Sequence, residues 1–293
     1  MTAIRKTTGE RTVDWLIAAG MWVVVAITLY PFLYVLSMSI SNPVYVIDGS
    51  VWLYPKGFSL RAYDTIFDNP DMWRSYGNTI FYTVAGTSIN IAMTVLAAYP
   101  LARRHFFLRK PIMVFIVVTM FFGGGLIPAF LLMQELGLYN TRWAMLMPGA
   151  ASAFLIIVSR TFFQDIPESL HESAKLDGAG EFAILLRIVL PLSMPIVAVL
   201  ALFYAVGHWN SFFPAMMYLP DPRLQPLSIY LIKVIIQNSD VALKDMIDQH
   251  DRSMISVQLK YAMIIVTIAP ILMIYPFLQK YFVKGVMIGS LKE

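Results

Sequence analysis

Long apolar runs separated by polar segments dominate the pattern of this chain. Six of these runs reach the roughly 20 residues that a helix needs to cross the hydrocarbon core of a bilayer. They cover about residues 15–40, 75–100, 111–133, 143–163, 188–207 and 256–280. The pattern predicts an all-α, polytopic membrane protein with six transmembrane helices, placed within residues 15–283.

The first apolar run follows a basic N-terminus and so resembles a secretory signal at first sight. The apolar part of such a signal is only about 7–15 residues long and precedes a cleavage site of small residues. The run over 15–40 is longer and lacks a convincing site of that kind. We therefore expect a retained first helix behind an N-terminal segment of residues 1–14.

Lysine and arginine are unevenly divided between the two sides that this topology defines. The more densely basic side holds the two ends of the chain, the 101–110 loop and the segment from 164 to 190. Its cations are Arg5, Lys6, Arg11, Arg103, Arg104, Arg109, Lys110, Arg160, Lys175, Arg187, Lys280, Lys284 and Lys292. Because basic loops remain in the cytoplasm, we expect both termini there and the 41–74 and 208–255 loops outside.

Composition supports membrane insertion and excludes several other classes. The chain is 58% hydrophobic and 14% charged, with a mean hydropathy of +0.66, whereas an average soluble domain is about 25% charged. The net charge of +4 fits basic cytoplasmic loops better than a nucleic-acid partner. The sequence has no cysteine, which excludes disulfides, thiolate metal sites and a cysteine nucleophile.

Ionisable residues are scarce inside the predicted spans. Asp, Glu, Lys and Arg are almost absent away from the span ends, which disfavours a proton-coupled carrier, although a sodium site built from carbonyls stays open. No G-x-x-x-x-G-K-[ST] phosphate loop occurs, so ATP has to be bound by another polypeptide unless transport is passive. We see no catalytic site, and the isolated histidines are His105, His171 and His208.

One acidic cluster superficially suggests a metal site. It consists of Asp245, Asp248, His250 and Asp251, interrupted by Lys244 and Arg252 in a polar loop. We favour a solvated surface there and predict no metal site.

The most informative segment is the polar loop after the fourth run, 164–190. It reads Glu172-Ser-Ala, then Gly178 after three further residues, then Ile188-x-Leu-Pro191 after nine more. A short helix through Glu172 to about Leu176 is expected, with Pro167 in its first turn, Asp165 as its cap and Gly178 at its end. A second stretch, Glu181 to Leu190, should lead to a membrane helix that begins at Pro191.

This spacing resembles the E-A-A-x3-G-x9-I-x-L-P loop of ABC importer permeases, with Ser173 in place of the first Ala. Several other segments resemble the carbohydrate-uptake type of that family: Asn78-Thr79, Ala98–Arg103, Trp209–Phe212 and Gln279–Gly285. Phe121–Pro128 is similar to a subgroup that handles larger oligosaccharides and polyuronates such as alginate.

The resemblance implies a multi-subunit importer of known composition. The chain would be one permease of an importer in a bacterial cytoplasmic (inner) membrane, paired with a second homologous permease, two ATPase subunits and an extracytoplasmic solute-binding protein. It would work by alternating access on a glycan, hold no cofactor itself, and leave ATP and Mg to the partner subunits. The implied ATPase-coupling residues are Glu172, Ser173, Ala174, Asp177, Gly178 and Ala179, and the tail contact is Lys284 and Gly285 in the C-terminal segment 284–293.

Candidates for the substrate pathway are weaker, and each has a structural alternative. Aromatic faces stack on sugars but also form interfacial belts, and amides bind hydroxyls but more often join helices. The candidates are Asn78, Asn90, Trp209, Asn210, Phe213 and Tyr218. The glycine break at 123–125 is equally consistent with a pathway lining, close helix packing or a helix end. An alternative function is a secondary transporter or a membrane-integral assembly subunit for another small solute.

Overall fold

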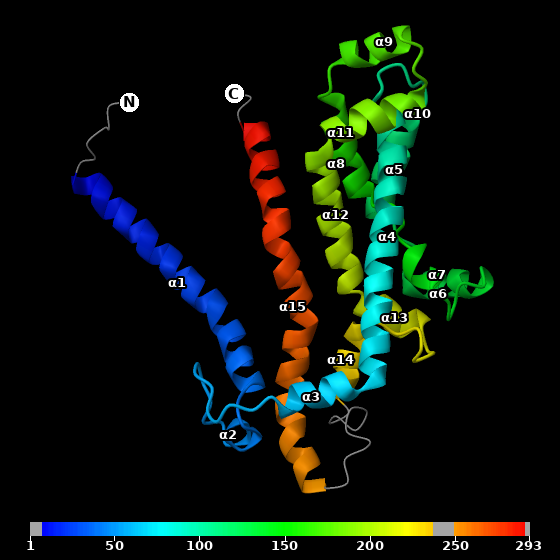
Figure 1. The fold of residues 1–293 in the computed structure, drawn as a ribbon. Helices are drawn as coiled ribbons and strands as arrows, with labels where there is room; N and C mark the ends of the chain where they lie inside the picture. Colours follow the sequence, from blue (N-terminus) through cyan, green and yellow to red (C-terminus); the bar gives the residue numbers. More distant parts are fainter. Residues whose placement is uncertain (1–7, 237–248, 291–293) are drawn as a thin grey trace. The chain divides into compact units, whose positions relative to one another are not determined.

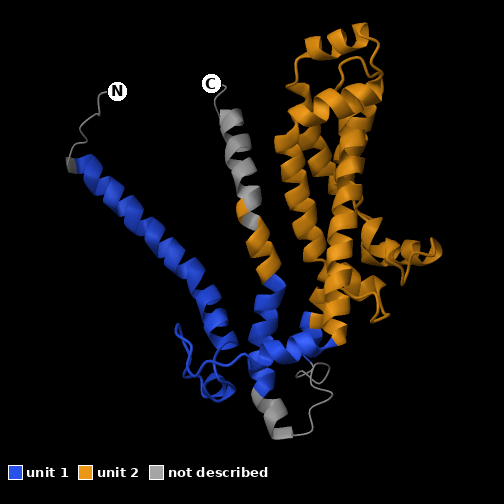
Figure 2. Cartoon of the chain, viewed as in Figure 1, with its two compact units in different colours: residues 1–69, 231–268 blue, residues 70–230, 269–293 orange. Residues whose placement is uncertain are grey.

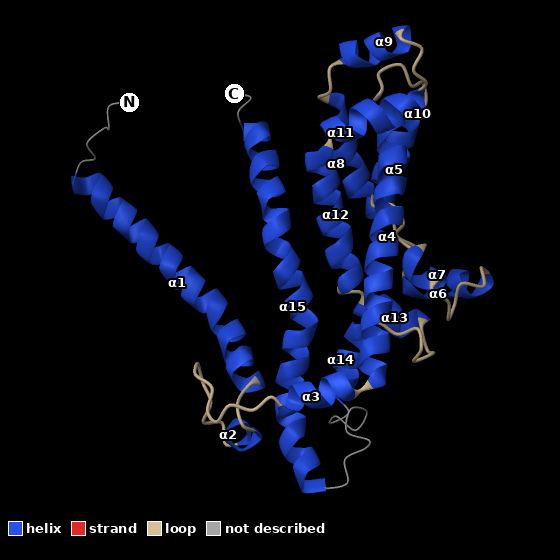
Figure 3. Ribbon diagram, in the orientation of Figure 1, coloured by secondary structure: helices blue, strands red, loops and turns tan. Residues whose placement is uncertain are grey.

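A computed structural model describes residues 8–236 and 249–290, with side chains described for 9–236, 255–274 and 276. The described chain is helices and loops (Figures 1 and 3), and its one recorded β-bridge joins Ser41 to Phe58. The helices before the polar loop are α1 Thr8–Ser39, α2 Pro43–Ile47, α3 Arg61–Asp68, α4 Pro70–Ala102, α5 Arg109–Phe121, α6 Leu126–Glu135, α7 Trp143–Leu146 and α8 Ala153–Gln164. The later ones are α9 Glu168–Leu176, α10 Glu181–Ile184, the π-helix η1 Leu185–Val189, α11 Leu190–Leu192, α12 Met194–Trp209, α13 Phe212–Tyr218, α14 Leu227–Ile236 and α15 Gln249–Ser290.

Three of the predicted spans are continuous helices. Residues Gly9–Ser39, Pro70–Ala102 and Ile255–Ile274 are long and apolar enough to cross a membrane, and bent helix pairs raise the number of candidate spans in the described residues to as many as five. The all-α class is therefore confirmed.

The third predicted span is broken rather than continuous. Its helices α5 and α6 meet at a bend of 115°, where Phe122–Gly125 leaves the helical path and Gly125 has φ +83°. Three successive glycines lower helix propensity, and the last adopts a conformation that side chains resist. A Cβ at Gly123 would meet open space within the described chain, so close packing within the described chain does not explain that glycine.

The fourth and fifth predicted spans are also interrupted. Residues 147–152 separate α7 from α8, and α8 is only 12 residues long. The fifth span bends by 84° between α11 and α12, so the long helix begins at Met194 rather than at Pro191. Pro195 in the first turn of α12 cannot donate a backbone hydrogen bond into the preceding turn, which allows the bend at Ser193.

The chain divides into two compact units (Figure 2), and each is described by itself. Residues 1–69 and 231–268 form the first unit, and residues 70–230 and 269–293 form the second.

In the first unit, a buried glutamine joins three segments. Gln258 of α15 has no exposed surface, and its Nε2 donates to the carbonyl oxygens of Ser39 and Ser59 at 3.0 Å each. The Tyr63 hydroxyl donates to Ser39 Oγ at 2.8 Å. These bonds hold the end of α1, the 41–60 loop and α3 against α15.

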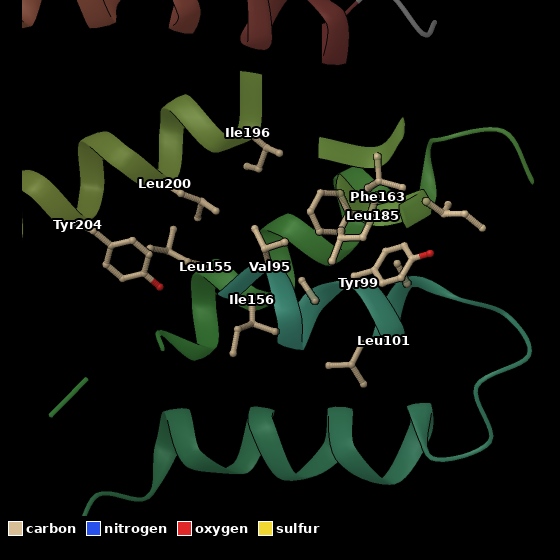
Figure 4. Packing of buried hydrophobic residues seen from close by; sticks show 14 of the residues in the cluster. Val95, Tyr99, Leu101, Leu155, Ile156, Phe163, Leu185, Ile196, Leu200 and Tyr204 are labelled. Carbon is tan, nitrogen blue, oxygen red and sulfur yellow. The ribbon is translucent and has the colours of Figure 1, made fainter. Parts of the chain in front are cut away.

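In the second unit, an apolar core lies where α4, α8 and α12 meet near the polar loop. Figure 4 shows Val95, Tyr99 and Leu101 of α4 facing side chains of two other helices and η1, all buried. These partners are Leu155, Ile156, Phe163, Leu185, Ile196, Leu200 and Tyr204. Packing in this cluster sets the position of the polar loop that follows α8.

The polar side chains of α4 bond to irregular segments elsewhere in the unit. Asn78 Nδ2 donates to the carbonyls of Arg223 and Gln225 at 2.8 and 3.1 Å, and the Tyr82 hydroxyl donates to that of Leu224 at 2.8 Å. Further along α4, Asn90 Nδ2 donates to the Gly149 carbonyl at 2.8 Å. Backbone groups released by breaks in neighbouring helices thus find partners on α4.

Close contact between α4 and α12 depends on Gly86. A Cβ at this position would overlap the imidazole ring of His208, whose Nε2 lies 2.6 Å from Asn90 Oδ1. The glycine therefore lets a histidine on α12 reach the amide on α4.

We predict that Gly86→Ala destabilises the protein by about 1–3 kcal/mol, since overpacking displaces the His208 ring and its bond to Asn90. Gly77→Ala is the matched control on the same helix, because a Cβ there meets open space in the described chain. Thermal unfolding of both variants in detergent measures the difference. An equal melting temperature for the two variants would contradict the packing role.

Candidate functional site

The polar loop folds as a helix, a turn and a second helix. Helix α9 runs from Glu168 to Leu176, and α10 begins at Glu181. The start of α9 differs from the prediction: Pro167 occupies the N-cap, and Asp165 ends α8 instead of capping α9. The stretch after α10 continues as a π-helix over 185–189, a wide turn that is frequent at functional sites.

The turn between α9 and α10 is a Schellman motif. Ala179 N–H donates to the Ala174 carbonyl at 2.9 Å, and Gly178 N–H donates to that of Lys175 at 3.0 Å. Gly178 has φ +82°, the left-handed conformation that this motif requires and glycine adopts without strain. The predicted helix stop at Asp177-Gly178 is confirmed.

A single carboxylate joins the turn to the end of α4. Glu181 Oε1 pairs with Lys175 Nζ at 2.6 Å, while Oε2 accepts from the Tyr99 hydroxyl at 2.8 Å. The Lys175–Glu181 pair is half-exposed, so its net contribution to stability is small. Its geometric effect is larger, because three helices, α4, α9 and α10, meet at this carboxylate.

The N-terminal end of α9 is attached to the same end of α4. Arg103 Nη2 pairs with Glu168 Oε1 at 2.8 Å, with the arginine side chain only 16% exposed. One turn further, the His171 ring stacks on Tyr99 with centroids 6.2 Å apart. Both ends of α9 are therefore held to the end of α4.

Burial divides the predicted coupling residues into two groups. Glu172, Ser173, Asp177 and Gly178 are exposed, which leaves them available to another polypeptide. Ala174 is 8% exposed and packs into the apolar core with Ala179 beside it. The small size of Ala174 serves packing within this chain.

Sequence reasoning missed two apolar side chains that the loop exposes. Leu176 is 90% exposed and Phe182 is 72% exposed, one on each side of the turn. These two side chains are apolar surface that a docking partner would cover. The signal that could have identified them is the presence of two large apolar residues in a segment that is otherwise polar.

Sequence reasoning also missed the residues that hold the loop in place. These are Tyr99, Arg103, His171, Lys175 and Glu181. Tyr99 lies 82 residues before Glu181, and Arg103 lies 65 residues before Glu168, pairings that no local pattern specifies.

The six pathway candidates lie in different environments. The buried ones are Asn78, Asn90, Trp209 and Tyr218, while Asn210 and Phe213 are exposed. Asn78 and Asn90 use their amides within the chain, Trp209 stacks edge-on against Tyr76 at 6.0 Å, and Tyr218 stacks on Phe130 at 6.2 Å. Only Asn210 and Phe213 among them present side chains outward from the chain.

Two of the sequence predictions cannot be placed. The tail residues Lys284 and Gly285 and the cluster Asp245, Asp248, His250 and Asp251 lie outside the described side chains. Among the side chains that are described, no group of three or more His, Cys, Asp or Glu residues has the arrangement of a metal site.

The structure is that of a multi-pass helical membrane protein with a helix–turn–helix loop attached to the end of one long helix. Residues 90–288 match the family of binding-protein-dependent transport system inner membrane components, and the chain belongs to it. It is accordingly a transport subunit and not an enzyme, and the predicted importer-permease fold and membrane localisation are confirmed.

Individual relatives extend the likeness over nearly the whole chain. Protein LplC of Bacillus subtilis (strain 168) is 42% identical, over 91% of this chain and 90% of that protein. The polygalacturonan/rhamnogalacturonan transport system permease YtcP of the same organism is 40% identical, over 97% and 99%. A crystal structure of a bacterial ABC transporter that imports the acidic polysaccharide alginate contains a chain with a TM-score of 0.87 and 32% identity, covering 96% of this chain and 100% of that one.

We predict that the loop packs less firmly at acidic pH. Burial, and to a lesser degree the nearby Arg103, lowers the pKa of His171 below its ordinary value, while Glu168 and Glu181 oppose this. The packed loop thus favours neutral imidazole, and its stability falls as the pH drops below about 6.5, where the unpacked state takes up a proton first. A spin label on Ser173→Cys, unique in a cysteine-free chain, should become more mobile between pH 7.5 and 5.5.

His171→Phe is the control for this measurement, since it keeps a ring against Tyr99 but cannot titrate. Its label mobility should not change with pH. The same pH response in both proteins would rule out His171 as the group responsible.

Proposed function

We propose that this chain is a permease subunit of an ATP-driven importer of acidic oligosaccharides or polysaccharides. The observation that carries the proposal is the α9 helix, which exposes Glu172 and Ser173 while both of its ends are held to α4. A partner that docks on the exposed side would move α4 with it. The phosphate-loop motif is absent from the sequence, so a docked ATPase would supply the energy.

The proposed assembly contains this chain, a second homologous permease, two ATPase subunits and an extracytoplasmic solute-binding protein. ATP and Mg would be bound by the ATPases, and closure of their dimer would rock the permeases between inward-open and outward-open states. The apolar window of α1 is not buried within the described chain, so lipid or the second permease has to cover it.

The orientation proposed for this assembly has both termini and the α9–α10 loop in the cytoplasm. The excess of lysine and arginine on that side supports it. A topology reporter fused after Glu293 should be active only in its cytoplasmic form, and activity of a periplasmic form would contradict the orientation.

Acidic substrates are proposed because two relatives share this chemistry. One transports polygalacturonan and rhamnogalacturonan, and the other belongs to an importer of alginate. Uronate carboxylates need positive partners, yet the predicted spans contain almost no cations. Cations at the extracytoplasmic ends of the helices are therefore proposed to meet the substrate.

Arg142 and Arg223 are the proposed substrate cations. Both are exposed, and their loops adjoin: Asn140 N–H donates to the Tyr218 carbonyl at 2.9 Å, and Asp221 N–H donates to Asn140 Oδ1 at 3.1 Å. Arg142 stacks over the Phe81 ring at 4.8 Å, which fixes the guanidinium direction. Asn210 and Phe213, exposed at the end of α12, are proposed as neutral pathway contacts.

We predict that Glu172→Lys uncouples ATP hydrolysis from transport. Reversing one charge in a docking contact costs up to about 1 kcal/mol if the contact is exposed and about 3–5 kcal/mol if it is buried. Substrate-stimulated ATPase activity of the reconstituted complex measures the loss.

Glu135→Lys is the matched control, an exposed charge reversal at the end of α6 on the predicted opposite side. It should leave stimulation intact. Normal stimulation in the Glu172→Lys complex would exclude a coupling role for this residue.

We predict that Arg142→Gln and Arg223→Gln together impair uptake of oligouronates, by about tenfold if one charge-assisted bond is lost. Arg142→Lys should retain most of the uptake because it keeps the charge. Uptake of labelled oligouronate into proteoliposomes is the measurement, and exposed Arg61→Gln on another predicted outer loop is the control. Equal uptake by the double variant and the wild type would remove these arginines from recognition.

A further inference from the structure

A polar pocket of about 220 Å³ lies at the start of the polar loop (residues 164–190), in the second unit. It is formed where α4 and α8 end and where α5 and α9 begin. Arg103, Arg104 and Arg109 line it together with the Gln164 amide and the Glu168 carboxylate. It is separate from the exposed coupling residues of α9 and from the proposed pathway residues.

Positive charge exceeds negative charge in this pocket. The Glu168 carboxylate is paired with Arg103 at 2.8 Å, which leaves the charges of Arg104 and Arg109 uncompensated by the lining side chains. Arg160 lies outside the lining but adjoins it through Gln164: with the Gln164 amide turned so that its oxygen accepts, that oxygen lies 3.1 Å from Arg160 Nη2 and 2.5 Å from Arg109 Nη2. One neutral amide thus stands between two guanidinium groups that repel each other.

The start of α5 adds to the same imbalance. Helix α5 begins at Arg109, and its first turn carries no acidic residue and its N-cap makes no side-chain hydrogen bond within the described chain. A helix N-terminus has a partial positive charge and favours anions, so the Arg109 guanidinium, which lines the pocket, is unfavourably placed there. An anion in the pocket would lie beside Arg109, the first residue of this helix, and would compensate the arginine charges.

We propose that this pocket binds a phosphate group. Arginine forks match the oxygens of a phosphate in paired hydrogen bonds, which distinguishes the pocket from a simple basic surface. The source is either the headgroup of an anionic phospholipid or a free phosphate, and both present the same chemistry. The position of the pocket at the end of a membrane helix, on the proposed cytoplasmic side, favours the lipid.

A phosphate bound in the pocket would affect the polar loop. Arg103 lines the pocket and holds Glu168 at the beginning of α9. A phosphate bound to Arg104 and Arg109 would fix the end of α4 relative to the start of α5 without displacing that ion pair. The phosphate site stands apart from the substrate, and its test does not depend on which glycan is transported.

The test uses the complete transporter, purified in detergent and stripped of lipid. Binding of fluorescent phosphatidylglycerol is compared with that of phosphatidylcholine carrying the same acyl chains, and radiolabelled inorganic phosphate is measured by equilibrium dialysis. Variants Arg104→Gln, Arg109→Gln and their combination are compared with Lys110→Gln, a matched loss of one charge beside the pocket. Size-exclusion chromatography confirms that each complex remains assembled.

The double variant should bind the anionic probe about tenfold or more weakly, whereas Lys110→Gln should stay within about twofold of the wild type. Preference for phosphatidylglycerol that millimolar inorganic phosphate does not displace identifies a lipid headgroup, and saturable binding of inorganic phosphate identifies the free ion. Equal affinity for the two lipids without phosphate binding would overturn the proposal. So would an unchanged double variant, or a loss in Lys110→Gln as large as that in the double variant.

Discussion

A buried backbone carbonyl or amide needs a hydrogen-bond partner, and the second unit depends on how α4 supplies such partners. The segments beside α4 include connections between helices, whose backbone groups lack partners in a helix of their own. The uninterrupted α4 carries polar side chains opposite several of these groups. Asn78 and Tyr82 donate to backbone carbonyls within residues 223–225, and Asn90 donates to the Gly149 carbonyl. Thr79 Oγ1 accepts from Leu227 N–H at 2.7 Å. Irregular segments persist beside α4 because their polar groups are satisfied there.

Helix α4 ends at the point where the polar loop with α9 and α10 is attached. Tyr99 and Arg103 hold the two ends of α9 through Glu181 and Glu168, and Arg160 of α8 donates to the Leu101 carbonyl at 3.1 Å. One rigid element therefore contacts both the irregular segments of the transmembrane part and the proposed docking loop. In the proposed assembly, this continuity would connect a docked ATPase mechanically to the transmembrane part.

Charged side chains are divided between the helix ends, where they are common, and the apolar spans, where they are scarce. The hydrocarbon core disfavours ionised groups, so the cations proposed to meet an acidic glycan and those of the proposed phosphate pocket both lie near helix ends. At one end Arg142 stacks on an aromatic ring, and at the other Arg103 is held by a carboxylate. These fixed geometries distinguish such arginines from the basic residues that only orient the chain in the membrane.

The sequence by itself determined the all-α class, three of the membrane segments and the helix–turn–helix form of the polar loop. Apolar runs, the Glu172–Pro191 spacing and Gly178 are local features whose physical meaning does not depend on distant residues, and the turn at Gly178 formed as expected. Tertiary structure decided the rest. The burial of Ala174 and the internal bonds of Asn78 and Asn90 depend on neighbours far along the chain. A hydropathy pattern records how apolar each segment is, whereas a hydrogen bond between residues 78 and 223 exists only once packing has brought them together.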